Sequence, residues 1–345
     1  MVVLRAFRRS HLTIIPCWNR TVMVCIALVS LVSVTTPASA QVTWQLATEY
    51  PQSNISGVGL TTFAKLVSAR TNGFVTIVNS FDNELRISSG EMIQAVEERR
   101  IVGGDAFAGP LEASDPVFGL PSLPFVVQSI NAARAVNSKA RPLYERTLAA
   151  HGLKLLYITI WPSTGLWSDR PLTKADDLRT MTLRTYDYNS AEVLRATGAT
   201  AEYLPFSEAI AKIRDHKLNG ILTSGDGGAG RKLWEYLSYF TPINYAIPIS
   251  FTFVGLGAFE ALPKQVQEQV EQAAVETEKS QFELLTNRAA ENYARMRTNG
   301  VNIAEPAPES VIASMKQGAV GPIAAWKAKV PVEAAAIVDW AIQQQ

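Results

Sequence analysis

The sequence is poor in the side chains that most often carry metal, redox and nucleophilic chemistry. It contains 2 cysteines and 3 histidines, and both cysteines, Cys17 and Cys25, lie within the first 40 residues. From residue 41 onward the chain has no thiol, which excludes disulfides, thiolate catalysis and cysteine-bound metals there. His151 and His216 stand far apart with no ligand-like spacing around either. We therefore expect no metal, no cofactor and no catalytic residue.

The sequence also lacks an excess of charge of one sign. It has 32 basic and 31 acidic residues, and four of the arginines lie in the first 40 residues, so the remainder carries a charge of about −3. No long run of Lys and Arg occurs. Because nucleic acids and anionic lipids are bound by clustered positive charge, we expect no nucleic-acid partner.

Long apolar runs are missing except near the start of the chain. Three arginines within the first nine residues precede an apolar run at 22–34 and small residues at 38–40. This order predicts a signal peptide over 1–40 that is cleaved near Ala40. The run is shorter than the roughly 20 residues that cross a bilayer, although a retained anchor is the alternative. We expect a periplasmic protein with no membrane insertion after cleavage.

Strand-like and helix-like segments alternate along the rest of the chain, a pattern typical of α/β lobes. The expected strands cover 42–48, 74–80, 101–108, 155–160, 178–185, 201–204 and 220–224, and the expected helices cover 57–71, 91–99, the region of 140–150, 190–197 and 207–217. A proline opens the segment 263–300 and a glycine closes it, with apolar residues every three or four positions between them. One helix of that length would bridge two lobes, and two helices broken near Ser280 are the alternative.

Several short motifs follow one another in a fixed order. They are Ala47-Thr48-Glu49-Tyr50-Pro51, Asp115-Pro116, Leu123-Pro124-Phe125, Arg170-Pro171-Leu172, Asp176-Asp177-Leu178, Thr182-Leu183-Arg184-Thr185-Tyr186, Leu204-Pro205-Phe206-Ser207-Glu208 and Leu233-Trp234-Glu235-Tyr236. Each is weak alone, but the ordered set resembles the periplasmic solute-binding subunits of TRAP transporters, the DctP-like family.

The resemblance implies a periplasmic-binding-protein fold of two α/β lobes with a hinge and a long bridging helix. The expected first lobe is 41–162 plus 250–285, and the second is 163–249 plus 286–345. The ligand would be a small organic acid held between the lobes, and the partners would be the membrane subunits of a TRAP transporter. A binding protein of an ABC or tripartite tricarboxylate transporter is the closest alternative.

Arg184 is the strongest candidate for a ligand contact. It stands near the end of the expected strand 178–185, the end at which open α/β sheets bind ligands. A guanidinium binds a carboxylate by donating two parallel hydrogen bonds, and it keeps its charge when water is excluded. A salt bridge to Asp187 is the alternative, and the family resemblance favours the ligand.

Other candidates come from loops at the ends of strands, where a rigid lobe displays its recognition groups. The resemblance also marks two departures: residues 219–224 lack the Glu and Asn common in the family, and 161–167 lack a second binding arginine. With one cation and tryptophan nearby, we expect a monocarboxylate with an apolar or aromatic body. The further candidates are Tyr50, Asn54, Glu84, Trp161, Trp167, Tyr186, Thr223 and Ser224.

Enzymes are the rival class. Residues 225–230 spell the Gly-x-Gly-x-x-Gly dinucleotide fingerprint after an expected strand, but no acidic strand end follows about 20 residues later. A plain glycine-rich turn is the preferred interpretation. No Gly-x-Ser-x-Gly elbow of a serine hydrolase occurs.

Overall fold

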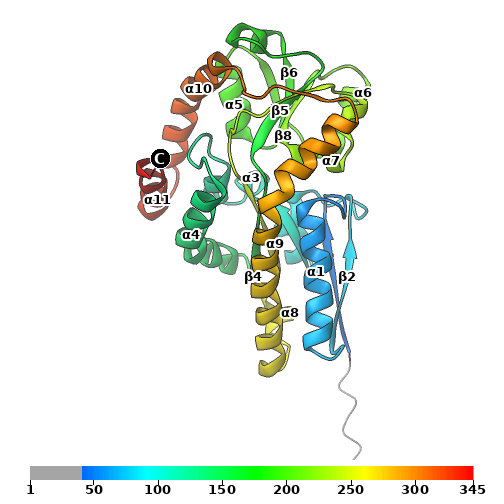
Figure 1. The fold of residues 1–345 in the computed structure, drawn as a ribbon. Helices are drawn as coiled ribbons and strands as arrows, with labels where there is room; N and C mark the ends of the chain where they lie inside the picture. Colours follow the sequence, from blue (N-terminus) through cyan, green and yellow to red (C-terminus); the bar gives the residue numbers. More distant parts are fainter. Residues whose placement is uncertain (1–40, 345) are drawn as a thin grey trace, which may run out of the picture. The chain divides into compact units, whose positions relative to one another are not determined.

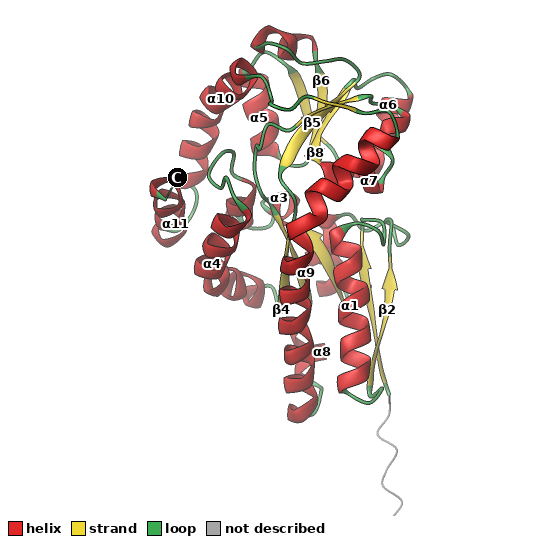
Figure 2. Ribbon diagram, viewed as in Figure 1, coloured by secondary structure: helices red, strands yellow, loops and turns green. Residues whose placement is uncertain are grey.

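A computed structural model describes residues 41–344 and contains two β-sheets with helices packed around them (Figures 1 and 2). The sheet of the first lobe has the strand order β2-β1-β3-β10-β4. Its strands β1, β2 and β3 are parallel, and β10 runs antiparallel to β3 and β4. The bounds of its strands are β1 Val42–Thr48, β2 Val75–Ser80, β3 Gly103–Phe107, β4 Leu153–Ile160 and β10 Ile249–Gly255.

The sheet of the second lobe has the order β11-β9-β5-β8-β6-β7. Strands β6, β7 and β8 are parallel, whereas β5 is antiparallel to β8 and β9. The bounds are β5 Thr164–Ser168, β6 Thr182–Thr185, β7 Thr200–Tyr203, β8 Gly220–Ser224, β9 Tyr239–Thr241 and β11 Asn302–Ile303. Because the carboxyl ends of parallel strands share an edge, the loops after β6 and β8 converge.

The helices fall into three groups along the chain. In the first part of the chain they are α1 Ile55–Arg70, η1 Ser89–Glu91, α2 Met92–Glu97, α3 Ala108–Leu111, η2 Pro116–Ser122 and α4 Ile130–Ala150. In the middle they are η3 Ala175–Thr180, α5 Tyr188–Ala196, α6 Phe206–Arg214, α7 Gly225–Gly230 and η4 Leu233–Glu235. The last are α8 Leu256–Glu260, α9 Lys264–Thr298, α10 Glu309–Lys327 and α11 Val332–Gln343.

From β1 to the end of α9 the chain joins the lobes in three places. Residues 161–163 link β4 to β5, residues 242–248 link β9 to β10, and α9 is one unbroken helix of 35 residues. Helix α9 packs on α1 and β4 of the first lobe and on α7 of the second. The expected bridging helix is therefore present, without a break near Ser280.

The first lobe is held to α9 by a layer of apolar side chains between β1 and helices α1 and α9. Phe63 of α1, Trp44 of β1 and Val270 of α9 are among the buried members of this cluster. Spacing of three and four places one face of α1 on the sheet, as an amphipathic helix requires. This packing fixes the loop between β1 and α1, which contributes to the site described below.

The end of the chain returns toward the first lobe. Helix α10 packs on α5, α11 packs on α4, and Trp326 donates a hydrogen bond of 2.7 Å to the Pro116 carbonyl. The lobe boundaries given above remain a proposal, and this packing suggests assigning α11 to the first lobe.

The strand expected at 178–185 is shorter in the structure, because its first half is not a strand. Residues 175–180 form the 3-10 helix η3, and only 182–185 are a strand. The Asp177 carboxylate accepts hydrogen bonds from the backbone amides of Thr173 and Lys174 at 2.7 and 3.0 Å, which stabilises the turn. No helix among residues 41–344 is both long enough and apolar enough to cross a bilayer.

Candidate solute-binding site

A small cavity lies where the ends of strands from both sheets meet. Its lining comes from the ends of β3 and β4 and the loop after β1 on one side, and from β5, β6, β8 and the start of α6 on the other, with Pro248 just before β10. The lining residues are Tyr50, Phe107, Trp161, Thr164, Arg184, Tyr186, Phe206, Thr223, Ser224 and Pro248. The set contains one cation and five aromatic rings, so the cavity suits a small anion with a flat or apolar body.

Arg184 brings the positive charge into this cavity from β6. Its side chain is buried, its Nε donates a 2.8 Å hydrogen bond to the Leu204 carbonyl, and its guanidinium lies 4.9 Å from the centre of the Phe206 ring. Within residues 41–344 its two Nη atoms have no hydrogen bond and no ion pair. Burial lowers the pKa of the guanidinium, although Tyr50 and the nearby carboxylate of Glu49 oppose this shift. A buried cation that forms no ion pair is suited to bind an anion.

The alternative salt bridge from Arg184 to Asp187 is not formed. The Asp187 carboxylate instead accepts hydrogen bonds from the Ser190 amide at 2.7 Å and from the Ser190 hydroxyl at 2.5 Å, and so caps α5. The helix cap satisfies Oδ1 of Asp187, whereas its Oδ2 is buried without a hydrogen-bond partner among the described residues. The guanidinium of Arg184 is left to face the cavity.

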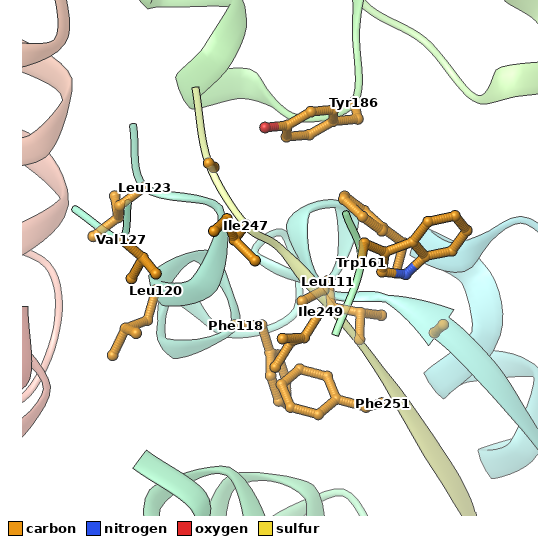
Figure 3. Packing of buried hydrophobic residues seen from close by; sticks show 14 of the residues in the cluster. Leu111, Phe118, Leu120, Leu123, Val127, Trp161, Tyr186, Ile247, Ile249 and Phe251 are labelled. Atoms are coloured by element: carbon orange, nitrogen blue, oxygen red, sulfur yellow. The ribbon is translucent and has the colours of Figure 1, made fainter. Parts of the chain in front are cut away.

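Aromatic rings from both lobes form the walls. The Trp161 ring centre lies 4.7 Å from that of Tyr50 and 6.0 Å from that of Phe107, and the Phe107 and Tyr186 centres are 5.2 Å apart across the lobes. Figure 3 shows Trp161 and Tyr186 at one side of a buried apolar cluster that includes Ile247. The Trp161 Nε1 donates to the Ser250 hydroxyl at 2.8 Å, which fixes the plane of its ring.

Hydroxyl groups supply the remaining polarity. Ser224 caps α7, because its hydroxyl accepts a 3.0 Å hydrogen bond from the Gly227 amide. The hydroxyls of Thr164 and Tyr186 are buried next to each other, so they can pair with each other or with a ligand. The walls therefore offer neutral hydrogen-bonding groups in addition to Arg184.

Three of the nine predicted site residues lie away from the cavity. Trp167 packs in the core of the second lobe, 5.3 Å from the Phe240 ring centre. Asn54 is buried at the start of α1 and donates to the Asp226 carbonyl at 2.6 Å, and Glu84 is exposed in the turn after β2. The structure brings together the other six, which are Arg184, Trp161, Tyr50, Tyr186, Thr223 and Ser224. A ligand contact by any of the nine stays a prediction.

The glycine-rich stretch 225–230 forms the short helix α7, and its glycines permit close packing. A methyl group on Gly228 would lie 2.3 Å from the ring of Trp167, and one on Gly230 would lie 2.2 Å from the Asn54 side chain. Only glycine fits where two elements approach this closely. This packing accounts for the motif without a dinucleotide.

Four lining residues were not predicted, namely Phe107, Thr164, Phe206 and Pro248. Phe107 ends β3, and Phe206 follows β7 within the Leu204-Pro205-Phe206 motif. Their places at strand ends were a usable signal for both. Pro248 and Thr164 flank the links between the lobes, and nothing in their local sequence distinguishes them from ordinary loop residues.

Two carboxyl groups from different lobes lie close enough to interact electrostatically. Asp187 follows β6 in the second lobe, Glu112 follows α3 in the first, and Asn189 donates a 2.7 Å hydrogen bond to Glu112 across the lobes. Burial raises the pKa of Asp187 to about 6. Burial, together with the negative charge of Asp187, raises the pKa of Glu112 to about 7. Among residues 41–344, no three His, Cys, Asp or Glu side chains form a group suited to a metal ion.

Comparison with solved structures gives close matches to two-lobed binding proteins. An extracytoplasmic solute receptor of Bordetella pertussis that binds pyroglutamic acid matches with a TM-score of 0.82 and 24% identity, over 88% of this chain and 100% of that one. A TRAP solute-binding protein from a marine metagenome, described as specific for pyroglutamate, gives 0.82 and 23% over 88% and 99%. A TRAP periplasmic protein of Haemophilus influenzae with bound L-gulonate gives 0.80 and 19% over 88% and 100%.

The fold and the cavity between its lobes define the class of periplasmic binding proteins. The family model for bacterial extracellular solute-binding protein, family 7, matches residues 46–320. The chain belongs to this DctP family of TRAP solute-binding proteins, which are receptors and not enzymes. A search of curated protein sequences finds no significant match.

Proposed function

We propose that this receptor binds a small monocarboxylate with a compact, partly apolar body, and presents it to the membrane subunits of a TRAP transporter. The observation that carries the proposal is Arg184, a buried guanidinium with two unpaired Nη atoms inside an aromatic cavity. A carboxylate would supply the missing counterion and accept from both Nη atoms. A single cation in the cavity favours a ligand with a single carboxylate.

The character of the cavity walls narrows the ligand further. Walls of aromatic rings favour a flat, compact ligand over a polyhydroxylated sugar acid. The hydroxyls of Thr164 and Tyr186 supply polar groups that can pair with a ligand in addition to Arg184. Pyroglutamate, the ligand of two structural relatives, combines one carboxylate with a small planar lactam, and it is our first candidate.

The test is a thermal-shift screen followed by calorimetry. Pyroglutamate should raise the melting temperature, because a ligand that binds only the native state stabilises it. Two matched compounds separate its groups: 2-pyrrolidinone keeps the lactam without the carboxylate, and cyclopentanecarboxylate keeps the carboxylate without the lactam. Succinate and galacturonate complete the panel.

We expect 2-pyrrolidinone to give no shift and cyclopentanecarboxylate to give a smaller shift than pyroglutamate. A protein that responds to amines or neutral sugars and to none of the acids would contradict the proposal. A response to galacturonate alone would support an organic acid as the ligand but contradict the proposal that the ligand is compact.

We further propose that the mature receptor begins near Gln41 in the periplasm, after cleavage of residues 1–40. Several structural relatives are described as periplasmic. The mass of the protein recovered from the periplasm would identify its first residue. Recovery of the full-length chain in the membrane fraction would contradict cleavage.

A further inference from the structure

One short segment of the second lobe forms hydrogen bonds and an ion pair with residues of the first lobe, mainly in one loop. The segment is α7 with Arg231, and the loop runs from Glu49 to Ile55 between β1 and α1. The inference drawn from it rests on the proposed ligand-binding function. We call the segment and loop together the clasp.

Arg231 forms one end of the clasp. One of its Nη atoms donates to the Glu49 carbonyl, and the other pairs with the Asp82 carboxylate at 2.9 Å. Both partners belong to the first lobe, whereas Arg231 follows α7 in the second. The Arg231 guanidinium is largely buried, so its hydrogen bond to the carbonyl is shielded from water and stronger than a surface contact.

Asp226 forms the other end. Asn54 is the N-cap of α1 but makes no capping hydrogen bond with its own side chain. Instead, the Asp226 carboxylate accepts from the Ile55 amide at 2.9 Å and from the Asn54 amide group at 3.2 Å. A carboxylate from one lobe therefore caps a 16-residue helix of the other, an arrangement favoured by both the free N–H groups and the helix dipole.

The capping carboxylate is held in place by α9. Its other oxygen accepts from Arg288 Nε at 2.6 Å and from Asn292 Nδ2 at 2.9 Å, and Arg288 also donates to the Ser53 carbonyl at 2.5 Å. Asp226 is almost fully buried. Because its orientation is fixed by two donors on α9, the cap is ready when the lobes meet.

The clasp is continuous with the candidate ligand site. Thr223 and Ser224 line the cavity directly before α7, and Tyr50 lines it from within the clasped loop. The Arg231 guanidinium lies 5.0 Å from the centre of the Phe206 ring, over which the Arg184 guanidinium also lies. A ligand that orders these side chains also orders the two sides of the clasp.

We propose that Asp226 and Arg231 are positioning residues that hold the lobes together around the bound solute and set how long it stays. Arg231 does not line the cavity, so it acts through lobe closure and not through contact with the solute. Its loss should therefore accelerate dissociation much more than it slows association. The fold-increase in the dissociation rate should be equal for every acid that binds.

The experiment is a double-mutant cycle. Stopped-flow tryptophan fluorescence measures the rates at which pyroglutamate binds to and dissociates from each variant. The variants are Arg231→Met, Asp82→Asn and the double. The change to Met keeps an unbranched side chain over Phe206 and removes the hydrogen bonds. Arg297→Met is the matched control, because Arg297 pairs with Glu305 within the second lobe and also lies over a ring, that of Tyr293.

Arg231→Met should raise the dissociation rate by about 2-fold to 150-fold, the range of coupled contacts. Asp82→Asn should have a smaller effect because Asp82 is largely exposed, and the double variant should lose less than the product of the two. Arg231→Lys should recover part of the loss, and Arg297→Met should bind like the wild type. Unchanged dissociation in Arg231→Met, or strictly multiplicative effects, would overturn the clasp.

A readout without ligand separates this inference from the proposed function. Hydrogen exchange of the Ile55 amide, whose acceptor is Asp226, should be faster in Asp226→Ala than in the wild type, because the ligand-free lobes also close part of the time and alanine removes the acceptor, while core amides of β1 remain unchanged. If no acid binds the wild type, the proposed function fails and this comparison still decides the clasp. Equal exchange at Ile55 in the two proteins would reject it.

Discussion

Arg184 is the residue on which recognition depends. Arg184→Ala would leave the ligand carboxylate enclosed without its counterion, which typically costs roughly 2 to 5 kcal/mol. Affinity should fall by about 30-fold to several thousand-fold. Arg184→Lys keeps the charge without the planar fork and should bind more weakly than wild type but better than alanine. Calorimetry with the acid found in the screen measures both variants.

Stability distinguishes a ligand contact from a structural one. Arg184 has no ion pair among residues 41–344, so the ligand-free Arg184→Ala protein should melt within a few degrees of ligand-free wild type. A variant that unfolds while keeping its affinity would assign Arg184 to the fold instead.

Asp105, Asp187 and Glu112 make the protein sensitive to pH. Burial raises the pKa of both aspartates from the ordinary 3.8 to about 6 and that of Glu112 from 4.5 to about 7, so the folded protein holds protons that the unfolded chain releases. The free energy of unfolding should therefore decrease as the pH rises from about 5 to about 8. Arg184 and Lys329 act in the opposite sense on the pKa values of Asp187 and Glu112, respectively, but burial dominates both.

Melting curves at pH 5.5 and pH 8 of wild type and Glu112→Gln test this dependence. The variant should lose much of the difference between the two pH values and should gain most at pH 8, where the wild-type carboxyl is charged. Glu91 and Asp177 have lowered pKa values, so their contributions change only at more acidic pH. A wild-type melting temperature that rises over this interval would contradict the assignment.

At the scale of elements, α7 depends on its glycines. Gly228→Ala would place a methyl group 2.3 Å from the Trp167 ring, whereas one on Gly257 in α8 would meet nothing within 4 Å. Overpacking of this kind costs about 1–3 kcal/mol. Gly228→Ala should lower the melting temperature by several degrees and Gly257→Ala should not. Equal melting temperatures would mean that Trp167 moves aside freely.

Most elements could be predicted from local sequence, because periodicity reports which side of a strand or helix is buried. The pattern gave β1 and α9 nearly to the residue, and it placed Arg184 at a strand end. It failed for 178–180, which belong to a 3-10 helix in which a carboxylate stabilises a turn over a strand-like pattern. It also did not show that Trp167 and Asn54 lie away from the cavity, because no local pattern tells whether a side chain at a strand end faces a cavity or the opposite lobe.

At the scale of the whole molecule, ligand binding should compact the protein. The cavity lining comes from both lobes, so a solute enters only when residues 161–163 and 242–248 allow the lobes to separate. The radius of gyration from small-angle X-ray scattering should decrease on adding the acid found in the screen. A radius that does not change would indicate a static pocket.

The unbroken helix α9 limits how this opening can occur. At 1.5 Å per residue its 35 residues extend for about 52 Å, and it is packed on α1 at one end and on α7 at the other. A stiff rod attached to two bodies allows them to roll about it or to bend it, but it does not allow them to slide apart along it. We therefore expect the lobes to move mainly by changing the angle between them, and a membrane partner that recognised this angle would detect from it whether a solute is bound.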